Sequence, residues 1–126
     1  MQNDRANKGR PTPIFVVGSA RNGTTWLCNT LAGHPDLSAA QHAAHWGFHE
    51  SNVLKNRRYW GDLSNLDRRI RFTTVYQRAD HCALVGGNEE ILEHAIEAAV
   101  TENGTADFYD VFFELMDRFA IRNGTR

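Results

Sequence analysis

The sequence predicts an α/β fold built around a parallel sheet, with only the N-terminal part of that fold in this chain. One observation is a short apolar run, PIFVVG at residues 13–18, which is rich in β-branched residues and typical of a strand buried on both faces. The other is that the remaining periodic segments have helical spacing. Because helices cannot supply the neighbours that a buried strand needs, we expect the other strands to come from chain beyond these 126 residues.

Composition narrows the class of protein. The formal net charge of −1 disfavours nucleic-acid binding, and no apolar run is long enough to span a membrane. The first 12 residues are polar without a secretory signal and predict a flexible tail, which leaves residues 13–126 as the domain portion. Two cysteines form neither a disulfide framework nor a metal site, so a reducing cytoplasm is the expected compartment.

Four weaker segments follow the apolar run. A helix is expected to start near Thr24 or Thr25 and to end at Gly33, before Pro35. Residues 37–60 lose their periodicity and predict irregular structure with short helical pieces. The next two segments are a weakly amphipathic helix over 66–79, with Ile70 and Thr74 or Val75 facing inward, and a short strand or turn over 81–87.

Two stronger helices end the chain. In NEEILEHAIEAAVTENG, Asn88 is the expected N-cap and Gly104 the terminating residue. In TADFYDVFFELMDRFAIRNG, Thr105 or Asp107 caps a helix that Gly124 stops. The expected buried stripes are Ile91, Leu92, Ala95, Ile96 and Ala99 in the first, and Phe108, Val111, Phe112, Leu115, Met116 and Phe119 in the second.

The stretch FVVGSARNGTTW carries the clearest chemical signal. A strand, a tight glycine turn and a helix start together aim backbone N–H groups and the positive helix end at one spot, which suits a phosphate-like anion. Gly18 and Gly23 give the backbone room to curl and to approach a ligand. Thr24 and Thr25 add hydroxyl donors, and Arg21 adds a forked cation for anionic oxygens.

The position after Gly23 separates two classes of nucleotide-binding protein. In P-loop triphosphatases this position is a lysine that reaches the β and γ phosphates, and here it is Thr24. Triphosphate hydrolysis is therefore the weaker interpretation. A glycine turn that joins strand to helix without any ligand is the structural alternative, and the two threonines and Arg21 argue against it.

PIFVVGSARNGTTWLCNTLAGHPDL resembles the 5′-phosphosulfate-binding loop of the sulfotransferases that use 3′-phosphoadenosine 5′-phosphosulfate (PAPS). That loop typically reads basic–Ser–Gly–Thr–Thr, often with a preceding proline, and is followed by a helix and frequently by His-Pro. Residues 21–25 occupy these positions, with Ala20 in place of the proline and Asn22 in place of the serine. The segment FYDVFFELMDRFAIRNGTR also resembles, more loosely, a helix of bacterial members.

The resemblance implies a P-loop-type three-layer α/β/α fold, of which this chain would hold the N-terminal portion. It implies sulfuryl transfer from PAPS to a hydroxyl or amine of a small-molecule, glycan or lipid acceptor, without a metal. The implied cofactor-binding residues are Ser19, Arg21, Asn22, Gly23, Thr24, Thr25 and Trp26. Arg21 would also be catalytic, because it can stabilise charge on the departing 5′-phosphate. The family's second cofactor element, an arginine and a serine that hold the 3′-phosphate, finds no match here.

The transfer also needs a base for the acceptor's proton, ideally with a pKa near the working pH. In some relatives, such as the tyrosylprotein sulfotransferases, a glutamate several residues after the His-Pro-Asp stretch acts as the base. Counted from His34, that place falls on Gln41 or His42. We therefore predict His42 as the base, with His45 second and Glu50 third, against packing or surface roles for these residues.

Three further interpretations stay open. His42, His45 and His49 have helical spacing that suits a metal site, although no cysteine or carboxylate completes the set. A P-loop kinase or NTPase-like protein and a non-catalytic binding module are the functional alternatives. The basic runs KNRR at 55–58 and DRRIR at 67–71 are typical of solvated faces, and an anionic acceptor is their functional alternative.

Overall fold

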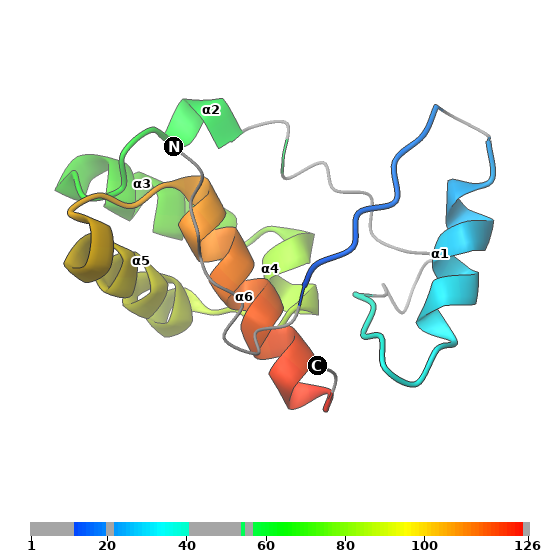
Figure 1. Cartoon of the computed structure of the whole chain (residues 1–126). Coiled ribbons are helices and arrows are strands. Elements are labelled where there is room, and N and C mark those ends of the chain that lie inside the picture. Colours follow the sequence, from blue (N-terminus) through cyan, green and yellow to red (C-terminus); the bar gives the residue numbers. More distant parts are fainter. Residues whose placement is uncertain (1–11, 20–21, 41–53, 55–56, 125–126) are drawn as a thin grey trace.

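The computed structural model describes residues 12–19, 22–40, 54 and 57–124 (Figure 1). This part of the chain is helical, and its elements follow one another without a sheet. The helices are α1 (Thr24–Ala32), α2 (Arg57–Trp60), α3 (Leu66–Tyr76), α4 (Asp80–Leu84), α5 (Glu89–Asn103) and α6 (Phe108–Arg122).

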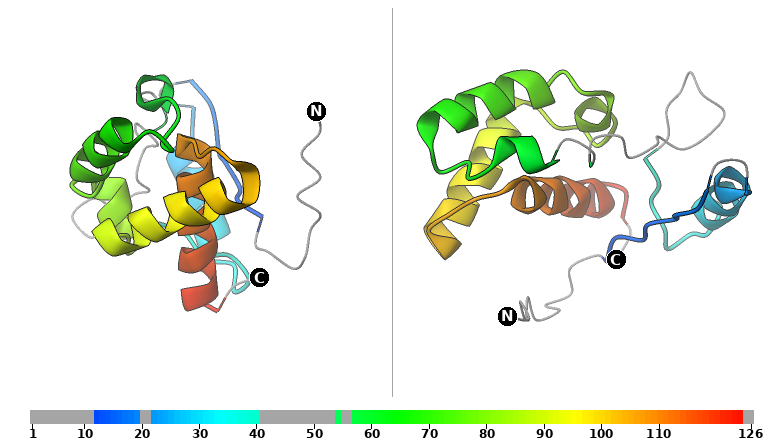
Figure 2. Two further views of the ribbon diagram at one scale, coloured as in Figure 1. Left: turned by 90° about the vertical axis from the view of Figure 1, so that its left-hand side faces the viewer. Right: turned by 90° about the horizontal axis from the view of Figure 1, so that it is seen from above.

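The hydrophobic core lies among the helices from α3 to α6. Helix α6 carries its apolar residues at helical spacing, and α5 packs against both α6 and α3. Figure 2 shows this group as one body, with α1 and the segments on either side of it at its flank. The largest fully buried side chains are Tyr76, Phe72, Phe108, Leu63, Leu92, Ile96, Leu115, Val111 and Cys82.

The ends of α5 and α6 follow the predicted caps. The Asn88 side chain accepts a hydrogen bond from Ile91 N at 2.9 Å, and Gly104 ends α5 with a left-handed φ of 77°. At α6 the Asp107 carboxylate accepts from Asp110 N at 3.1 Å, and Asp110 Oδ2 accepts from Asp107 N at 2.9 Å. This reciprocal pair is a capping box, and it identifies Asp107 as the cap of α6.

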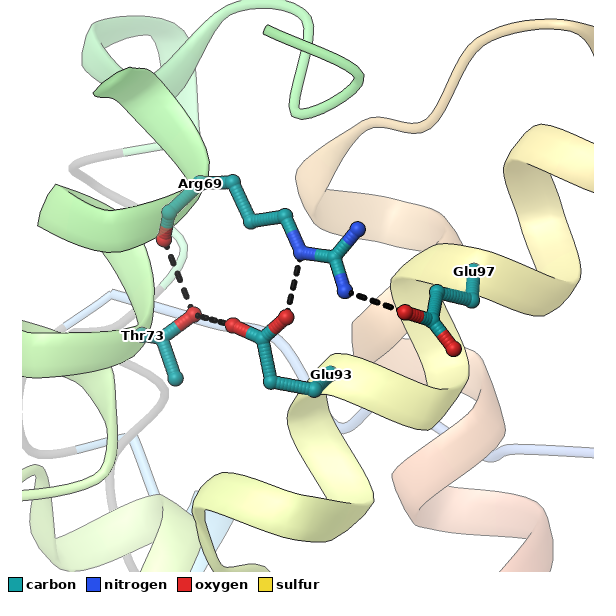
Figure 3. A network of polar contacts seen from close by, with 4 residues as sticks. All are labelled: Arg69, Thr73, Glu93 and Glu97. Carbon is teal, nitrogen blue, oxygen red and sulfur yellow. Dashed lines mark hydrogen bonds and ion pairs between the residues drawn. The ribbon is translucent and has the colours of Figure 1, made fainter. Parts of the chain in front are cut away.

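A polar network joins α3 to α5 (Figure 3). Arg69 forms ion pairs with Glu93, through Nε, and with Glu97, where Nη2 lies 2.8 Å from Oε1. The Thr73 hydroxyl lies 2.8 Å from both Glu93 Oε1 and Arg69 O, and its single hydrogen serves one of these acceptors at a time. The network fixes the register of α3 against α5 at the edge of the core.

A buried polar pair joins α3 to α4. Tyr76 Oη lies 2.8 Å from His81 Nδ1, and the His81 ring stacks on Phe112 with ring centroids 5.1 Å apart. Burial raises the pKa of Tyr76 well above its usual value, and the nearby Cys82 adds to the rise. The hydroxyl therefore stays protonated, and it can donate to His81 while both groups remain away from water.

The predicted three-layer α/β/α fold with a parallel sheet is wrong for this structure. Residues 12–18 are extended as expected, but no strand or sheet is present among the described residues. An extended segment becomes a strand only when neighbouring backbone completes its hydrogen-bond ladder, and every other regular element described is a helix. The side chains of Ile14 and Val17, expected to be buried, are 60% and 86% exposed. Phe15 stacks on the core, with its ring centroid 6.0 Å from that of Phe112.

Two local predictions were also wrong. Residues 81–87 form neither a strand nor a turn alone, because the segment begins with α4 and its buried His81 and Cys82. A five-residue helix is too short for its period to be read from sequence. In α3 the buried residues are Phe72, Thr73 and Tyr76, while Ile70 and Val75 are exposed. The two aromatic rings, four residues apart, bury more area than the aliphatic pair would.

We predict that Arg69→Ala lowers the free energy of unfolding by about 1–3 kcal/mol, because Glu93 is left partly buried without its partner. Urea denaturation monitored by circular dichroism measures the change. Arg118→Ala is the matched control, since Arg118 pairs with Glu114 within α6 and not between helices. It should change stability by less than about 0.5 kcal/mol. Equal losses in the two variants would contradict the role of the network.

Candidate functional site

The glycine loop closes on itself through Asn22. In the carboxamide orientation that satisfies both of its polar atoms, Asn22 Nδ2 donates to Ser19 O at 2.9 Å and Oδ1 accepts from Ser19 N at 3.0 Å. The side chain thereby bridges the two described ends of the loop, on either side of residues 20–21. The amide that replaces the usual serine of the resembling family thus has a defined structural partner.

The two glycines of the loop are required for different reasons. A Cβ on Gly18 would lie 2.9 Å from Asn22 Cγ and closer still to the carboxamide atoms, so Gly18 makes room for the bridging side chain. Gly23 has a φ of 88°, in the left-handed region that side chains disfavour, and no atom of the described residues lies within 4 Å of the place where its Cβ would be. Gly23 therefore provides both the turn into α1 and open space beside it.

The N-terminus of α1 is exposed to solvent at Gly23, Thr25 and Trp26. Leu27 N donates to Gly23 O at 3.0 Å, which is the first hydrogen bond of the helix, so the amides of Thr24, Thr25 and Trp26 precede the helical ladder. Gly23 has no side chain to cap them, and the first turn holds no acidic residue. The positive end of the helix dipole is therefore uncompensated within that turn, at a solvent-accessible position, which favours an oxyanion.

Helix α1 stands on the flank of the helical body, held there by the segments on either side of it (Figure 1). None of its residues is fully buried, and the Trp26 side chain is 71% exposed. After α1, Pro35, Leu37, Ser38 and Ala39 meet the end of α6 at Phe119 and Asn123 around a hollow of about 310 Å³. The extended segment before α1 and the returning segment after it both reach α6.

The His-Pro-Asp stretch noted in the sequence forms the turn after α1. His34 N donates to Leu31 O at 3.0 Å, and His34 Nδ1 accepts from Asp36 N at 3.2 Å. Gly33 ends the helix as predicted, although its φ of −75° is right-handed. Burial raises the pKa of the Cys28 thiol within α1, so this thiol is protonated at neutral pH and is not an activated nucleophile.

The described part of the chain brings together one group of predicted site residues. Six of the predicted cofactor-binding residues follow one another around the start of α1: Ser19, Asn22, Gly23, Thr24, Thr25 and Trp26. The two predicted catalytic residues, Arg21 and His42, lie outside the described residues, as do the alternative bases His45 and Glu50. The structure therefore describes the backbone around the start of α1 without placing the predicted catalytic groups.

The contact between Gly18 and Asn22 is the feature of the loop that sequence reasoning missed. The spacing of Gly18 and Gly23 in the sequence predicts that both make room for a ligand. Only the position of the Asn22 carboxamide shows that Gly18 serves a contact inside the loop. An asparagine four residues after a glycine carries no signal of this kind in the sequence.

The described residues form no metal-binding cluster and no membrane-spanning helix. Among those residues, no group of three or more histidine, cysteine, aspartate or glutamate side chains could hold a metal ion. The histidines of the predicted metal alternative, His42, His45 and His49, lie outside the described residues. No helix in the described part of the chain is long and apolar enough to cross a membrane.

Comparison with known proteins gives one result. A family model described as the sulfotransferase family matches residues 13–121, which include the whole loop and nearly all of the helical body. Searches of curated proteins and of solved structures found no match.

The loop geometry predicts that Gly18→Ala and Asn22→Ala each speed amide hydrogen exchange at Leu27, by about fivefold, because either change removes the bridge worth about 1 kcal/mol. Exchange monitored by NMR measures this at the first helical hydrogen bond.

The double variant tests the contact itself. Once Asn22→Ala has removed the carboxamide, the methyl group that Gly18→Ala adds has nothing to strike. Gly18→Ala/Asn22→Ala should therefore exchange no faster than Asn22→Ala alone. Effects that multiply in the double variant would show that the two residues act independently.

Proposed function

The chain belongs to the sulfotransferase family over residues 13–121, and we propose that its loop at residues 18–26 binds the phosphosulfate group of PAPS. A sulfotransferase moves a sulfuryl group from a donor to an acceptor, and PAPS would supply that group when bound. The acceptor would be a hydroxyl or amine of a small molecule, a glycan or a lipid. This function agrees with the family and with an anion site made of backbone.

The conformation of Gly23 is the observation that carries the proposal. The phosphosulfate oxygens need several N–H donors converging on one point, with no carboxylate nearby to repel them. The left-handed Gly23 turns the chain into α1 beside open space, and the first turn of α1 contains no acidic residue. Because the donors are backbone amides, their direction is set by the helix and does not depend on side-chain rotamers.

Arg21 would supply the charge that the backbone lacks. Sulfuryl transfer, like phosphoryl transfer, moves negative charge onto the leaving oxygen, and a fixed cation beside that oxygen lowers the barrier. Arginine stays protonated throughout, so its role would be electrostatic and not that of a proton donor. Thr24 stands where a P-loop triphosphatase has its phosphate-binding lysine, which favours phosphosulfate over triphosphate as the ligand.

His42 is the proposed base for the acceptor's proton. An imidazole has a pKa near neutrality, and it can therefore accept a proton at working pH and release it afterwards. The proposal rests on its place after the His-Pro-Asp stretch, and His45 and Glu50 are the next candidates in that segment.

We predict that adenosine 3′,5′-bisphosphate binds the protein and that Arg21→Ala weakens binding about tenfold or more, as loss of a charged hydrogen bond implies. Isothermal titration calorimetry measures both values. Arg78→Ala, which removes an exposed arginine at the end of α3, is the control and should leave affinity unchanged. Unaltered affinity in the Arg21 variant would refute its role, and tighter magnesium-dependent binding of ATP would favour the kinase alternative.

His42→Ala should lower kcat for sulfate transfer by about a hundredfold or more, because general-base catalysis contributes that much. Its affinity for adenosine 3′,5′-bisphosphate should stay the same, which separates a catalytic role from a binding role. Transfer of labelled sulfate from PAPS to a panel of hydroxyl and amine acceptors measures kcat. His45→Ala is the matched variant, and a larger loss of kcat there would move the base to His45.

A further inference from the structure

A second concave, positively charged surface lies between α2 and the start of α3. It is a hollow of about 290 Å³ lined by Arg58, Tyr59, Trp60, Gly61, Arg68 and Arg71, and we call it the arginine hollow. Neither the family membership nor the proposed loop chemistry uses these residues. Helices α2 and α3 lie on the opposite side of the molecule from α1 in Figure 1, so the hollow is separate from the loop at residues 18–26.

The chain builds this hollow from a turn and two helices. Gly61 joins α2 to the turn before α3 with a φ of 61°, and a Cβ there would lie 3.2 Å from Arg68 Cζ and closer still to Nη1. The absence of that Cβ lets the Arg68 guanidinium lie directly over the turn. Arg71 follows three residues later, on the same side of α3. The edge-to-face contact of Trp60 with Phe72, at 5.3 Å, holds α2 against the core.

Within the described part of the chain, the three arginines form no ion pair with a carboxylate. Among the described residues, the arginines that form ion pairs are Arg69 and Arg118. Three like charges around one hollow repel one another, so the folded chain holds positive charge that an anion would neutralise.

Asp62, the carboxylate that follows Gly61 in the turn, has hydrogen-bond partners of its own. Asp62 Oδ1 accepts hydrogen bonds from Ser64 N at 2.9 Å and from Ala106 N at 3.4 Å. Hydrogen bonds from Ser64, first of all, hold the pKa of Asp62 below its usual value, with smaller contributions from Ala106 N–H and from the charge of Arg68. Asp62 therefore uses Oδ1 to close the turn, and although its charge acts on Arg68, no ion pair within the described residues joins Asp62 to a guanidinium of the hollow.

We propose that the arginine hollow binds a doubly charged oxyanion ester carried on a planar ring, as in an aryl phosphate. Guanidinium groups present forked N–H donors that match the oxygens of such a group, and three of them suit a dianion better than a monoanion. The Tyr59 side chain is 83% exposed beside them and offers a face on which a ring can stack. This proposal does not depend on the proposed phosphosulfate loop, and either proposal can be refuted without affecting the other.

The two sites can be distinguished in one experiment because each has its own tryptophan. Trp60 lines the arginine hollow, and Trp26 lies in the first turn of α1. Phenyl phosphate is titrated at pH 8, where it is a dianion, into the ¹⁵N-labelled full chain at low salt. The indole N–H signals, assigned with Trp60→Phe and Trp26→Phe, report the two sites separately.

The Trp60 signal should shift with saturation, and Arg68→Gln and Arg71→Gln should each weaken the fitted affinity about tenfold, as loss of a charged hydrogen bond implies. Arg78→Gln removes the same charge from an exposed position outside the hollow and should change affinity less than about twofold. Phenyl sulfate, a monoanion, and inorganic phosphate, which lacks the ring, should each bind several-fold more weakly.

Three outcomes would overturn the proposal. A Trp60 signal that does not saturate, or a shift confined to Trp26, would show that the hollow does not bind the dianion. Equal losses in the Arg78 and Arg68 variants would show attraction to surface charge alone. Equal affinity for inorganic phosphate and phenyl phosphate would remove the ring from the recognition. Retained dispersion of the ¹⁵N spectrum shows that each variant is folded.

Discussion

The apolar stripe of α6 is the contact on which the rest of the structure depends. Phe108 and Phe112 meet Tyr76 of α3 and His81 of α4, and α5 packs along the same helix. Each fully buried aromatic ring of this kind contributes about 1.5–3 kcal/mol. The peripheral segments use the same helix, because Phe15 stacks on Phe112 and the chain after α1 meets Phe119. Without α6, the described segments on both sides of the glycine loop would lose these contacts with the core.

The position of the loop outside the core suits an anion site. A buried loop would have to satisfy its amides within the protein, whereas the start of α1 is exposed and has no side-chain cap. The geometry of an exposed loop must then be fixed by contacts within the loop itself. The Asn22 bridge to Ser19 and the space that Gly18 leaves for it constrain the loop from within.

The arginine side chains on the two faces of α3 differ in whether they form ion pairs. Arg69 points toward α5 and is neutralised by Glu93 and Glu97, whereas Arg68 lines the hollow beside α2 and forms no ion pair with any described residue. Adjacent residues of one helix lie about 100° apart, so a single basic run divides between a structural face and an open one. The run DRRIR shows its positive charge in the sequence, but the division between faces depends on which helices pack beside α3.

Local signals explain what sequence reasoning predicted well. The caps of α5 and α6, the start of α1 at Thr24 and the apolar stripe of α6 were all predicted, because caps and helical periodicity depend on residues a few positions apart. The turn at Gly23 that leads directly into α1 was expected too, whereas anion binding by this loop stays a prediction. The buried face of α3 and the helical state of α4 were not, since their local patterns are short or ambiguous.

The sequence by itself determined the ends of α5 and α6, the start of α1 and the apolar stripe of α6. Tertiary structure alone decided that the apolar run at residues 12–18 stays extended without a sheet among the described residues, because a strand exists only where other backbone pairs with it. It also decided that Gly18 serves Asn22 and that three arginines line one hollow. The distance between Gly18 and Asn22, and the distances among the three arginines, depend on how the chain turns between them. A local residue pattern in the sequence does not record these distances.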